Sequence, residues 1–224
     1  MLGKFINHCE DSLTASVFTH LLHLPSEVFW KILSNACYYT DCLPKHAGEP
    51  LSVEPFPNWN PKGTVNTNRV IPDLFIRFAN FDLIVEAKRR DADMQDPDQW
   101  EKEVTAYANE FGEEKIPVRM IALGGVGNRK KDEEVPFINR SCTVHMCKWE
   151  HLLAECKRMK KEMEGIQYKS SQTYACARTI THLIDLFAWH GFSTGQWFSD
   201  FNFEKHRLSP LIISCLGLFQ LRRK

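Results

Sequence analysis

The sequence predicts an α/β fold in which a central mixed β-sheet is flanked by helices and followed by a helical C-terminal extension. Two observations predict it: short apolar runs of strand character alternate with segments that repeat apolar residues every three or four positions. The chain of 224 residues, 43% of them hydrophobic, is long enough to bury one sizeable core. We therefore expect one main domain over residues 1–164 and the helical extension over residues 165–224.

Composition excludes several classes of protein. The formal net charge is zero and the isoelectric point is near 7.1, so no bulk basic field argues for nucleic-acid binding, and such contacts must come from local clusters. The opening stretch, MLGKFINHCED, carries charges and lacks an apolar run long enough for a signal sequence or a membrane span. Eight cysteines without a C-x-x-C spacing favour reduced thiols. We therefore expect a cytoplasmic protein with no membrane partner.

Several segments have the apolar period and the end signals of helices. The first covers residues 5–22, and the second begins at PSEVFWKILSNA with Ser26 as the expected N-cap. The third, DPDQWEKEVTAYANEFG, is expected to begin with Asp96 as N-cap and Pro97 at the first helical position. Helices are also expected over KWEHLLAECKRMKKEM and over residues 170–224, where TITHLIDLFAWHGF has the clearest pattern.

The strand signals come from short apolar runs between turn residues. LFIRF and FDLIVEA are separated by AN and are expected to form an antiparallel hairpin at the centre of the sheet. IPVRMIALGG and CTVHMC are expected to be further strands, so that strands and helices alternate after the hairpin. Residues 43–68 are rich in Pro, Gly and Asn, which predicts irregular chain or a short edge strand. GGVGNRKKDEE lacks the spacing of a phosphate-binding loop and predicts a turn followed by a charge run.

A carboxylate and an amine end the second run of the hairpin, in the stretch LIVEAKRR. Side chains alternate along a strand, so Glu86 and Lys88 share a face. Antiparallel pairing through FAN places Asp73 close to opposite Glu86. Two converging carboxylates repel unless a cation lies between them, and Mg²⁺ binds through one or two carboxylates while keeping several waters. Lys88 is then placed to hold an attacking water and to offset charge in the transition state.

The order P-D, an interval, then E-x-K at the end of an apolar strand resembles the PD-(D/E)XK, or restriction-endonuclease-like, nuclease superfamily. The matching residues are Pro72, Asp73, Glu86 and Lys88, and the resemblance covers residues 5–148. It implies an initial helix before a mixed sheet whose second and third strands carry the motif, with a metal-bound site that cleaves phosphodiester bonds. It also implies Mg²⁺ (or Mn²⁺) as the cofactor and DNA as the substrate, with RNA as the other open substrate.

The resemblance also implies roles for particular residues. Asp73 and Glu86 would ligate the metal, with the Ala87 carbonyl as a third ligand, and Lys88 would position the nucleophilic water. The superfamily often adds an acidic residue from the first helix and a glutamine, sometimes with a tyrosine, from the helix after the motif strand. This chain supplies Glu10, Gln99 and Tyr107 at those places.

Structural alternatives stand beside some of these roles. Gln99 lies three residues after Asp96, a capping-box spacing in which the amide returns to the helix start. Tyr107 lies on the apolar stripe of its helix and is expected in the core rather than in the site. Glu10 rather than Asp11 is expected to face the metal, because Glu10 lies on the main apolar stripe of the first helix. The alternative for Glu10 is a carboxylate at the edge of that stripe, reaching water.

Two other groups of residues have competing interpretations. Cys142, His145 and Cys147 are expected in the core rather than in a zinc site, because alternation places Cys142 on the opposite face of the strand from the other two. The basic residues near the motif strand and the glycine turn are expected either to contact phosphates or to form a solvated rim. They are Lys88, Arg89, Arg90, Arg129, Lys130 and Lys131.

The sequence thus predicts a Mg²⁺-dependent nuclease that acts on DNA as a homodimer or as a subunit of a larger assembly, for example in restriction, phage defence, repair or transposition. Two other classes stay open. One is a catalytically inactive member of the same fold that binds nucleic acid or scaffolds a complex, which divalent-metal binding would distinguish. The other is an unrelated α/β binding module with a coincidental motif, which predicts that Asp73 and Glu86 lie far apart.

Overall fold

A computed structural model describes residues 10–65, 68–89, 94–138 and 140–193 of the chain. Within these residues it contains five helices and six strands, which form one sheet. The elements in chain order are α1 (Glu10–Leu22), α2 (Ser26–Ala36), β1 (Ser52–Pro55), β2 (Leu74–Arg77), β3 (Asp82–Ala87), α3 (Pro97–Phe111), β4 (Val118–Leu123), β5 (Glu133–Phe137), β6 (Arg140–Cys147), α4 (Trp149–Gly165) and α5 (Ser171–Trp189).

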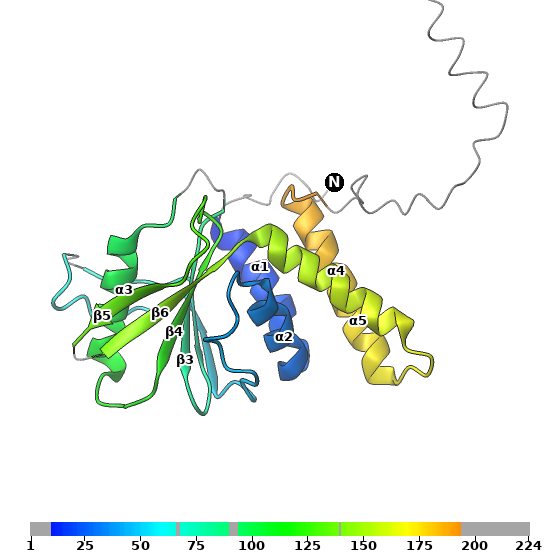
Figure 1. Cartoon of the computed structure of the whole chain (residues 1–224), viewed down its shortest axis with the longest axis horizontal. Helices are drawn as coiled ribbons and strands as arrows, with labels where there is room; N and C mark the ends of the chain where they lie inside the picture. The colour runs from blue at the N-terminus through cyan, green and yellow to red at the C-terminus, as the bar shows by residue number, and fades with distance from the viewer. Residues whose placement is uncertain (1–9, 66–67, 90–93, 139, 194–224) are drawn as a thin grey trace, which may run out of the picture. The chain divides into compact units, whose positions relative to one another are not determined.

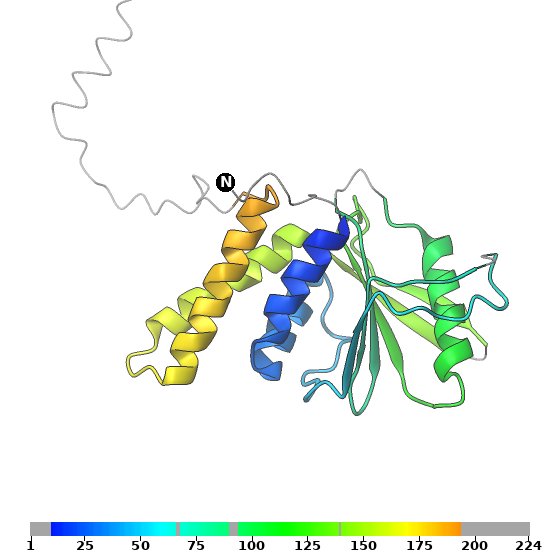
Figure 2. The same ribbon diagram turned by 180° about the vertical axis from the view of Figure 1, so that it is seen from behind.

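The sheet is mixed and carries helices on both faces (Figure 1, and from behind in Figure 2). The strands are ordered β1-β2-β3-β4-β6-β5. Neighbours are antiparallel from β1 to β3, parallel from β3 through β4 to β6, and antiparallel again between β6 and β5. Helix α3 covers one face and α1 and α2 cover the other, with α4 packed against α2 and α5 packed against α1 and α4. The predicted α/β class is confirmed.

The hairpin of β2 and β3 forms as the apolar runs predicted. Its register pairs Leu74 with Val85 and Arg77 with Asp82. Every residue of β3 is buried, because other strands flank it and helices cover both faces. Burial on both faces therefore explains why the run FDLIVEA is apolar without alternation. The short edge strand expected within residues 43–68 is β1, which pairs with β2.

Two apolar cores lie on the two faces of the sheet. Cys142 belongs to the core on the α3 side and Cys147 to the core on the side of α1 and α2, as alternation along β6 predicted. His145 is buried, and its Nδ1 lies 2.8 Å from Asp132 Oδ2. Burial lowers the pKa of His145, so the ring is held as the neutral form beside that carboxylate.

Arg77 and Tyr107 compensate the buried Asp82 carboxylate at the start of β3. The Asp82 carboxylate accepts hydrogen bonds from Arg77, at 3.1 Å from Nε and 2.9 Å from Nη2. The Tyr107 hydroxyl donates to the same carboxylate at 2.8 Å. Asp82 therefore has the cation and the hydrogen-bond donors that a buried charge requires. Tyr107 lies in the core, as predicted, and its hydroxyl serves this end of the strand.

The two predicted N-caps have different outcomes. The Asp96 side chain caps α3 by accepting a hydrogen bond from a first-turn backbone N–H, and Pro97 is the first helical residue, as predicted. The predicted Ser26 cap of α2 is wrong, because Ser26 is already helical and Pro25 occupies the N-cap position. Pro25 is extended, with φ −52° and ψ 140°, and the Ser26 hydroxyl donates instead to Glu49, a charged acceptor.

Strand β5 was not predicted, because its residues follow directly on a charge run. Only Val135 and Phe137 of this strand are buried, so its apolar signal is two residues long. Pro136 is tolerated because β5 is an edge strand and one side of its backbone needs no partner. The stretch GGVGNRKKDEE, which predicted a turn and a charge run, therefore continues into the edge strand β5.

Helix α5 confirms the helical character of the extension as far as Trp189. The expected helix over residues 194–224, the first turn expected over residues 5–9, and Arg90 lie outside the described residues. Among the helices that are described, none has the length and the apolar character to cross a membrane.

Candidate functional site

Asp73 and Glu86 lie together at the end of the β2–β3 hairpin. The register that pairs Leu74 with Val85 continues by one step, which places Asp73 opposite Glu86. Asp73 Oδ2 accepts a hydrogen bond from the Ala87 backbone N–H at 2.7 Å. Glu86 is only 2% exposed. The hairpin therefore brings the two carboxylates together, and an arrangement that holds them far apart is excluded.

Lys88 completes the motif on the same side of the strand end. Its Nζ lies 2.5 Å from Glu86 Oε1. Its backbone is held on both sides, because its N–H donates to the Leu123 carbonyl at 2.8 Å and its carbonyl accepts from the Trp149 indole at 2.9 Å. Trp149, the first residue of α4, thus holds the backbone of Lys88 at the end of β3.

Glu10 reaches the site from the start of α1. Its Oε2 accepts a hydrogen bond from the Arg89 backbone N–H at 2.8 Å, and its Oε1 lies 3.7 Å from Lys88 Nζ. Asp11 is exposed. The structure therefore turns Glu10, and not its neighbour, toward the motif, as the helical period predicted. The Arg89 guanidinium Nη2 donates to the His190 carbonyl at 3.1 Å, which ties the end of α5 to the same place.

Gln99 also joins the group, from the first turn of α3. Its Nε2 donates to Glu86 Oε1 at 2.7 Å and to Glu103 Oε1 at 3.1 Å. These two bonds turn the Gln99 amide toward the carboxylates, whereas the capping-box alternative requires it to return to the helix start. Gln99 therefore holds an oxygen of Glu86 in place.

Glu103 was missed by reasoning from the sequence. It lies one turn after Gln99 and is 1% exposed. Burial, the nearby Glu86 carboxylate and a hydrogen bond to Glu86 together raise the pKa of Glu103 well above its ordinary value. Burial beside Glu86 therefore disfavours the ionised form of Glu103. A signal was present, because position 103 shares the buried helical face of Trp100 and Tyr107, where an acidic residue is uncommon.

The charges of the site perturb one another. Burial and the Glu86 carboxylate raise the pKa of Asp73 to about 7. Burial also raises the pKa of Glu86, although the Lys88 amine opposes that rise. For Lys88, burial favours a lower pKa, but the carboxylates of Glu86, Glu10 and Asp73 together outweigh burial and the pKa is raised. The carboxyls are therefore harder to ionise than in water, and the amine is firmly protonated.

Carboxyl groups outnumber amines at the site. Asp73, Glu86 and Glu10 act on the single amine of Lys88, and Glu103 adds a fourth carboxyl. Excess buried carboxylates are costly unless protons or a bound cation compensate them. The raised pKa values of Asp73, Glu86 and Glu103 express this cost. A cation at the strand end would remove it.

The oxygens at this strand end suit a hard divalent cation. Over residues 10–65, 68–89, 94–138 and 140–193, no three His, Cys, Asp or Glu side chains are already arranged around a common point as metal ligands. Mg²⁺ needs fewer, because it is held by one or two carboxylates and keeps several waters. The N–H and C=O of a strand residue point to the same neighbour, so the Ala87 carbonyl lies on the side of Asp73. The sequence-based expectation that Asp73, Glu86 and the Ala87 carbonyl ligate a metal stays a prediction.

Two residues of the predicted basic rim, Arg129 and Lys130, lie over aromatic rings. The Arg129 guanidinium lies 5.7 Å from the ring centroid of Trp100, and the Lys130 amine lies 5.9 Å from that of Tyr38. Lys131 is exposed. These contacts, each worth about 0.5–1 kcal/mol at exposed sites, fix where the cations lie and leave their phosphate role as a prediction.

Gly124 is expected to tolerate no side chain. Its φ is +73°, and a Cβ there would lie 2.1 Å from the Lys88 carbonyl oxygen and 2.7 Å from the Trp149 indole. Gly124→Ala should displace the strand end and lower the free energy of unfolding by about 3 kcal/mol in denaturant titrations. Gly48→Ala is the matched control, because φ is +74° there but the Cβ would meet open space. Equal losses in the two variants would show that the contact with Lys88 is unimportant.

The paired substitutions Glu10→Gln and Asp11→Asn test which carboxylate of α1 serves the site. Glu10→Gln is expected to reduce metal-dependent cleavage about tenfold or more, because Glu10 faces Lys88, and to change the melting temperature little. Asp11→Asn should change neither quantity, because Asp11 is exposed. The measurements are initial cleavage rates and thermal melting, and the opposite ranking would refute the assignment.

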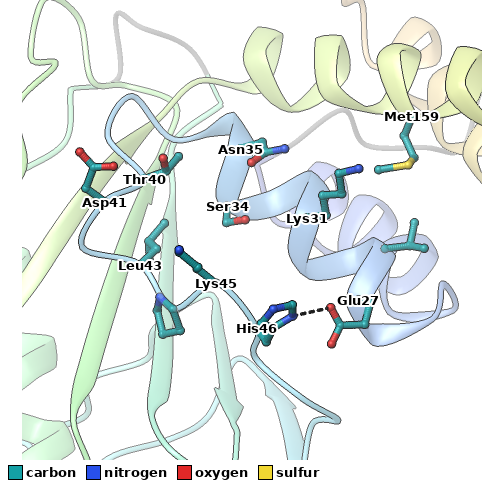
Figure 3. Close-up of a pocket in the computed structure, with 12 residues that line it drawn as sticks. Glu27, Lys31, Ser34, Asn35, Thr40, Asp41, Leu43, Lys45, His46 and Met159 are labelled. Atoms are coloured by element: carbon teal, nitrogen blue, oxygen red, sulfur yellow. Dashed lines mark hydrogen bonds and ion pairs between the residues drawn. The ribbon is translucent and has the colours of Figure 1, made fainter.

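A separate hollow of about 580 Å³ lies between α2, the segment of residues 40–46 and α4 (Figure 3). Three of its lining residues are already paired: Glu27 lies 3.1 Å from His46, and Lys31 lies 3.3 Å from Glu162. None of the residues at the hairpin end lines it. Its acidic residues, Glu27 and Asp41, are exposed, whereas the hairpin end gathers buried carboxyls, so the hairpin end is the better candidate.

Comparisons with known proteins give one distant relative. An uncharacterised protein of Pasteurella multocida (strain Pm70) is 25% identical to this chain over an alignment of 205 positions, and the alignment covers 84% of this chain and 72% of that protein. No family model matches the chain, and no solved structure matches it. The function must therefore be argued from the geometry of the site.

Proposed function

We propose that the chain is a Mg²⁺-dependent nuclease that hydrolyses phosphodiester bonds in DNA. The observation that carries the proposal is the meeting of Asp73, Glu86 and Lys88 at the end of a buried strand, where carboxyls outnumber the single amine. Phosphodiester hydrolysis needs an ion to neutralise the phosphate and a group that orients water, and these residue types supply both.

Each residue has a part in the proposed reaction. Asp73 and Glu86, with the Ala87 carbonyl, would hold Mg²⁺, which supplies Lewis-acid polarisation of the scissile phosphate. Lys88 orients the attacking water and stabilises the charge that develops on phosphate oxygens. Gln99 keeps Glu86 Oε1 in place through its 2.7 Å hydrogen bond.

The restriction-endonuclease-like arrangement is part of the proposal. It is supported by α1 preceding the hairpin, by the motif lying on β2 and β3, and by the passage through α3 to the parallel strand β4. A cytoplasmic location is proposed because the described cysteines are free thiols, as in reducing compartments. A chain of this size is proposed to work as a homodimer or as the nuclease subunit of a larger assembly.

The test is incubation of the purified chain with supercoiled, linear and single-stranded DNA and with RNA, in Mg²⁺, Mn²⁺, Ca²⁺ or chelator. We expect cleavage of DNA in Mg²⁺ and Mn²⁺, and binding without efficient cutting in Ca²⁺, whose longer oxygen distances misplace the attacking water. Equal rates in Ca²⁺ and Mg²⁺ would contradict this mechanism. Binding of nucleic acid with no cleavage in any metal would instead favour the catalytically inactive alternative.

A further inference from the structure

Gln95, in the loop before α3, is 2% exposed and uses its whole side-chain amide in hydrogen bonds. Its Nε2 donates to the Glu86 carbonyl at 3.0 Å and to the Gly124 carbonyl at 3.1 Å. Its Oε1 accepts a hydrogen bond from the Trp100 indole Nε1 at 2.8 Å. The amide therefore joins the ends of β3 and β4 to the first turn of α3.

One of these bonds leads directly to Asp73. The Glu86 carbonyl and the Ala87 N–H belong to the same peptide group, and that N–H donates to Asp73 Oδ2 at 2.7 Å. Three hydrogen bonds thus run in one direction, from the Trp100 indole through the Gln95 amide and the peptide to the carboxylate. Hydrogen bonds in such a chain polarise one another, by about 10–30% per bond.

This series of hydrogen bonds sets the orientation of the Asp73 carboxylate. Oδ2 accepts a hydrogen bond from the Ala87 N–H, and this bond fixes how the carboxylate is turned. The orientation of the peptide depends in turn on Gln95, because Gln95 Nε2 donates to its carbonyl. Groups that orient metal ligands in this way commonly change metal affinity by about 10–100-fold when they are removed.

We propose that Gln95 is a positioning residue, which presents Asp73 to the metal ion through the Glu86–Ala87 peptide group. The inference rests on the proposed function, because it assigns Gln95 to the metal site of that function. The competing explanation is a purely structural clamp between β3 and β4, since Gln95 also holds the Gly124 carbonyl. A clamp stabilises the fold but has no reason to alter metal affinity.

The experiment measures Mg²⁺ affinity by titration calorimetry and metal-free melting temperature on the full chain. Gln95→Met keeps the shape but removes both donors, and it should weaken Mg²⁺ binding about tenfold. Trp100→Phe removes only the indole N–H, the first donor in the series of hydrogen bonds, and should weaken Mg²⁺ binding about twofold. Asn109→Leu is the control, because the Asn109 amide also bridges two carbonyls, those of Asn60 and Lys62, both at 2.8 Å. It should leave Mg²⁺ affinity unchanged.

The outcomes separate this inference from the proposed function. Unchanged affinity in both Gln95→Met and Trp100→Phe, with lower melting temperatures, would establish the clamp and overturn the inference. If Gln95→Met does not fold, Trp100→Phe decides alone. A wild-type chain that binds no Mg²⁺ would overturn the proposed function and this inference with it.

Discussion

Asp73→Asn and Glu86→Gln are each expected to abolish Mg²⁺-dependent cleavage while the protein stays folded. Each change removes a negative charge and an anionic ligand oxygen but keeps the shape of the side chain. The expected loss in rate is about a thousandfold or more, because the ion and its charge stabilisation are lost together. The measurement is the initial rate on the best DNA substrate, with circular dichroism as the check on folding. Full activity in either variant would refute the assignment.

The Asp73→Asn variant should also be more stable than the wild type when no metal is present. The pKa of Asp73 is raised from 3.8 to about 7, so the folded state holds this proton more tightly than the unfolded state. Stability therefore falls as the pH rises through that window. The variant should melt above the wild type at pH 8, and the difference should shrink toward pH 4. Added Mg²⁺ should raise the melting temperature of the wild type more than that of the variant.

Lys88→Ala is expected to remove turnover and to leave Mg²⁺ binding intact. An ammonium group cannot ligate Mg²⁺, but it stabilises charge that develops on phosphate, and losing such a group costs about 10²–10³ in rate. The Lys88 amine also lies 2.5 Å from Glu86, so its removal frees that carboxylate for the ion. Single-turnover rates and titration calorimetry measure the two quantities separately.

Lys131→Ala is the control for Lys88, because Lys131 is an exposed basic residue of the predicted rim. It should change the salt dependence of DNA binding at most, and leave the single-turnover rate close to that of the wild type. A Lys88→Ala variant with weaker metal affinity and preserved turnover would reverse the roles assigned to the amine and the carboxylates.

The hairpin and its carboxylates could be predicted because their signals are local. Two apolar runs joined by a short turn fix both the pairing and the register, and the register alone places Asp73 opposite Glu86. The helical period likewise separated Glu10 from Asp11 before any contact was known. Asp96 and Pro97 marked the start of α3 in the same way.

The features that could not be predicted depend on tertiary contacts, which leave little pattern in the sequence. Strand β5 needs only two buried side chains because it lies at an edge, so charge masked its pattern. The Ser26 hydroxyl found a carboxylate 23 residues away, Glu49, which no capping rule anticipates. Gln95 lies just before the helix, and its importance comes from two carbonyls on different strands. Such partners become visible only once the sheet is assembled.

β3 carries a buried carboxylate at each end, and only one of them is neutralised by the fold itself. Asp82 has Arg77 and Tyr107, whereas Glu86 shares a single amine with other carboxyls. The two ends of one strand therefore differ in how their buried charge is compensated, and the Glu86 end is the one that a bound cation would stabilise. An ion bound only by the folded chain adds about 2.7 kcal/mol at a hundred times its dissociation constant. Mg²⁺ at the proposed site would then compensate the Glu86 end of β3, and its free concentration would set part of the stability of the folded chain.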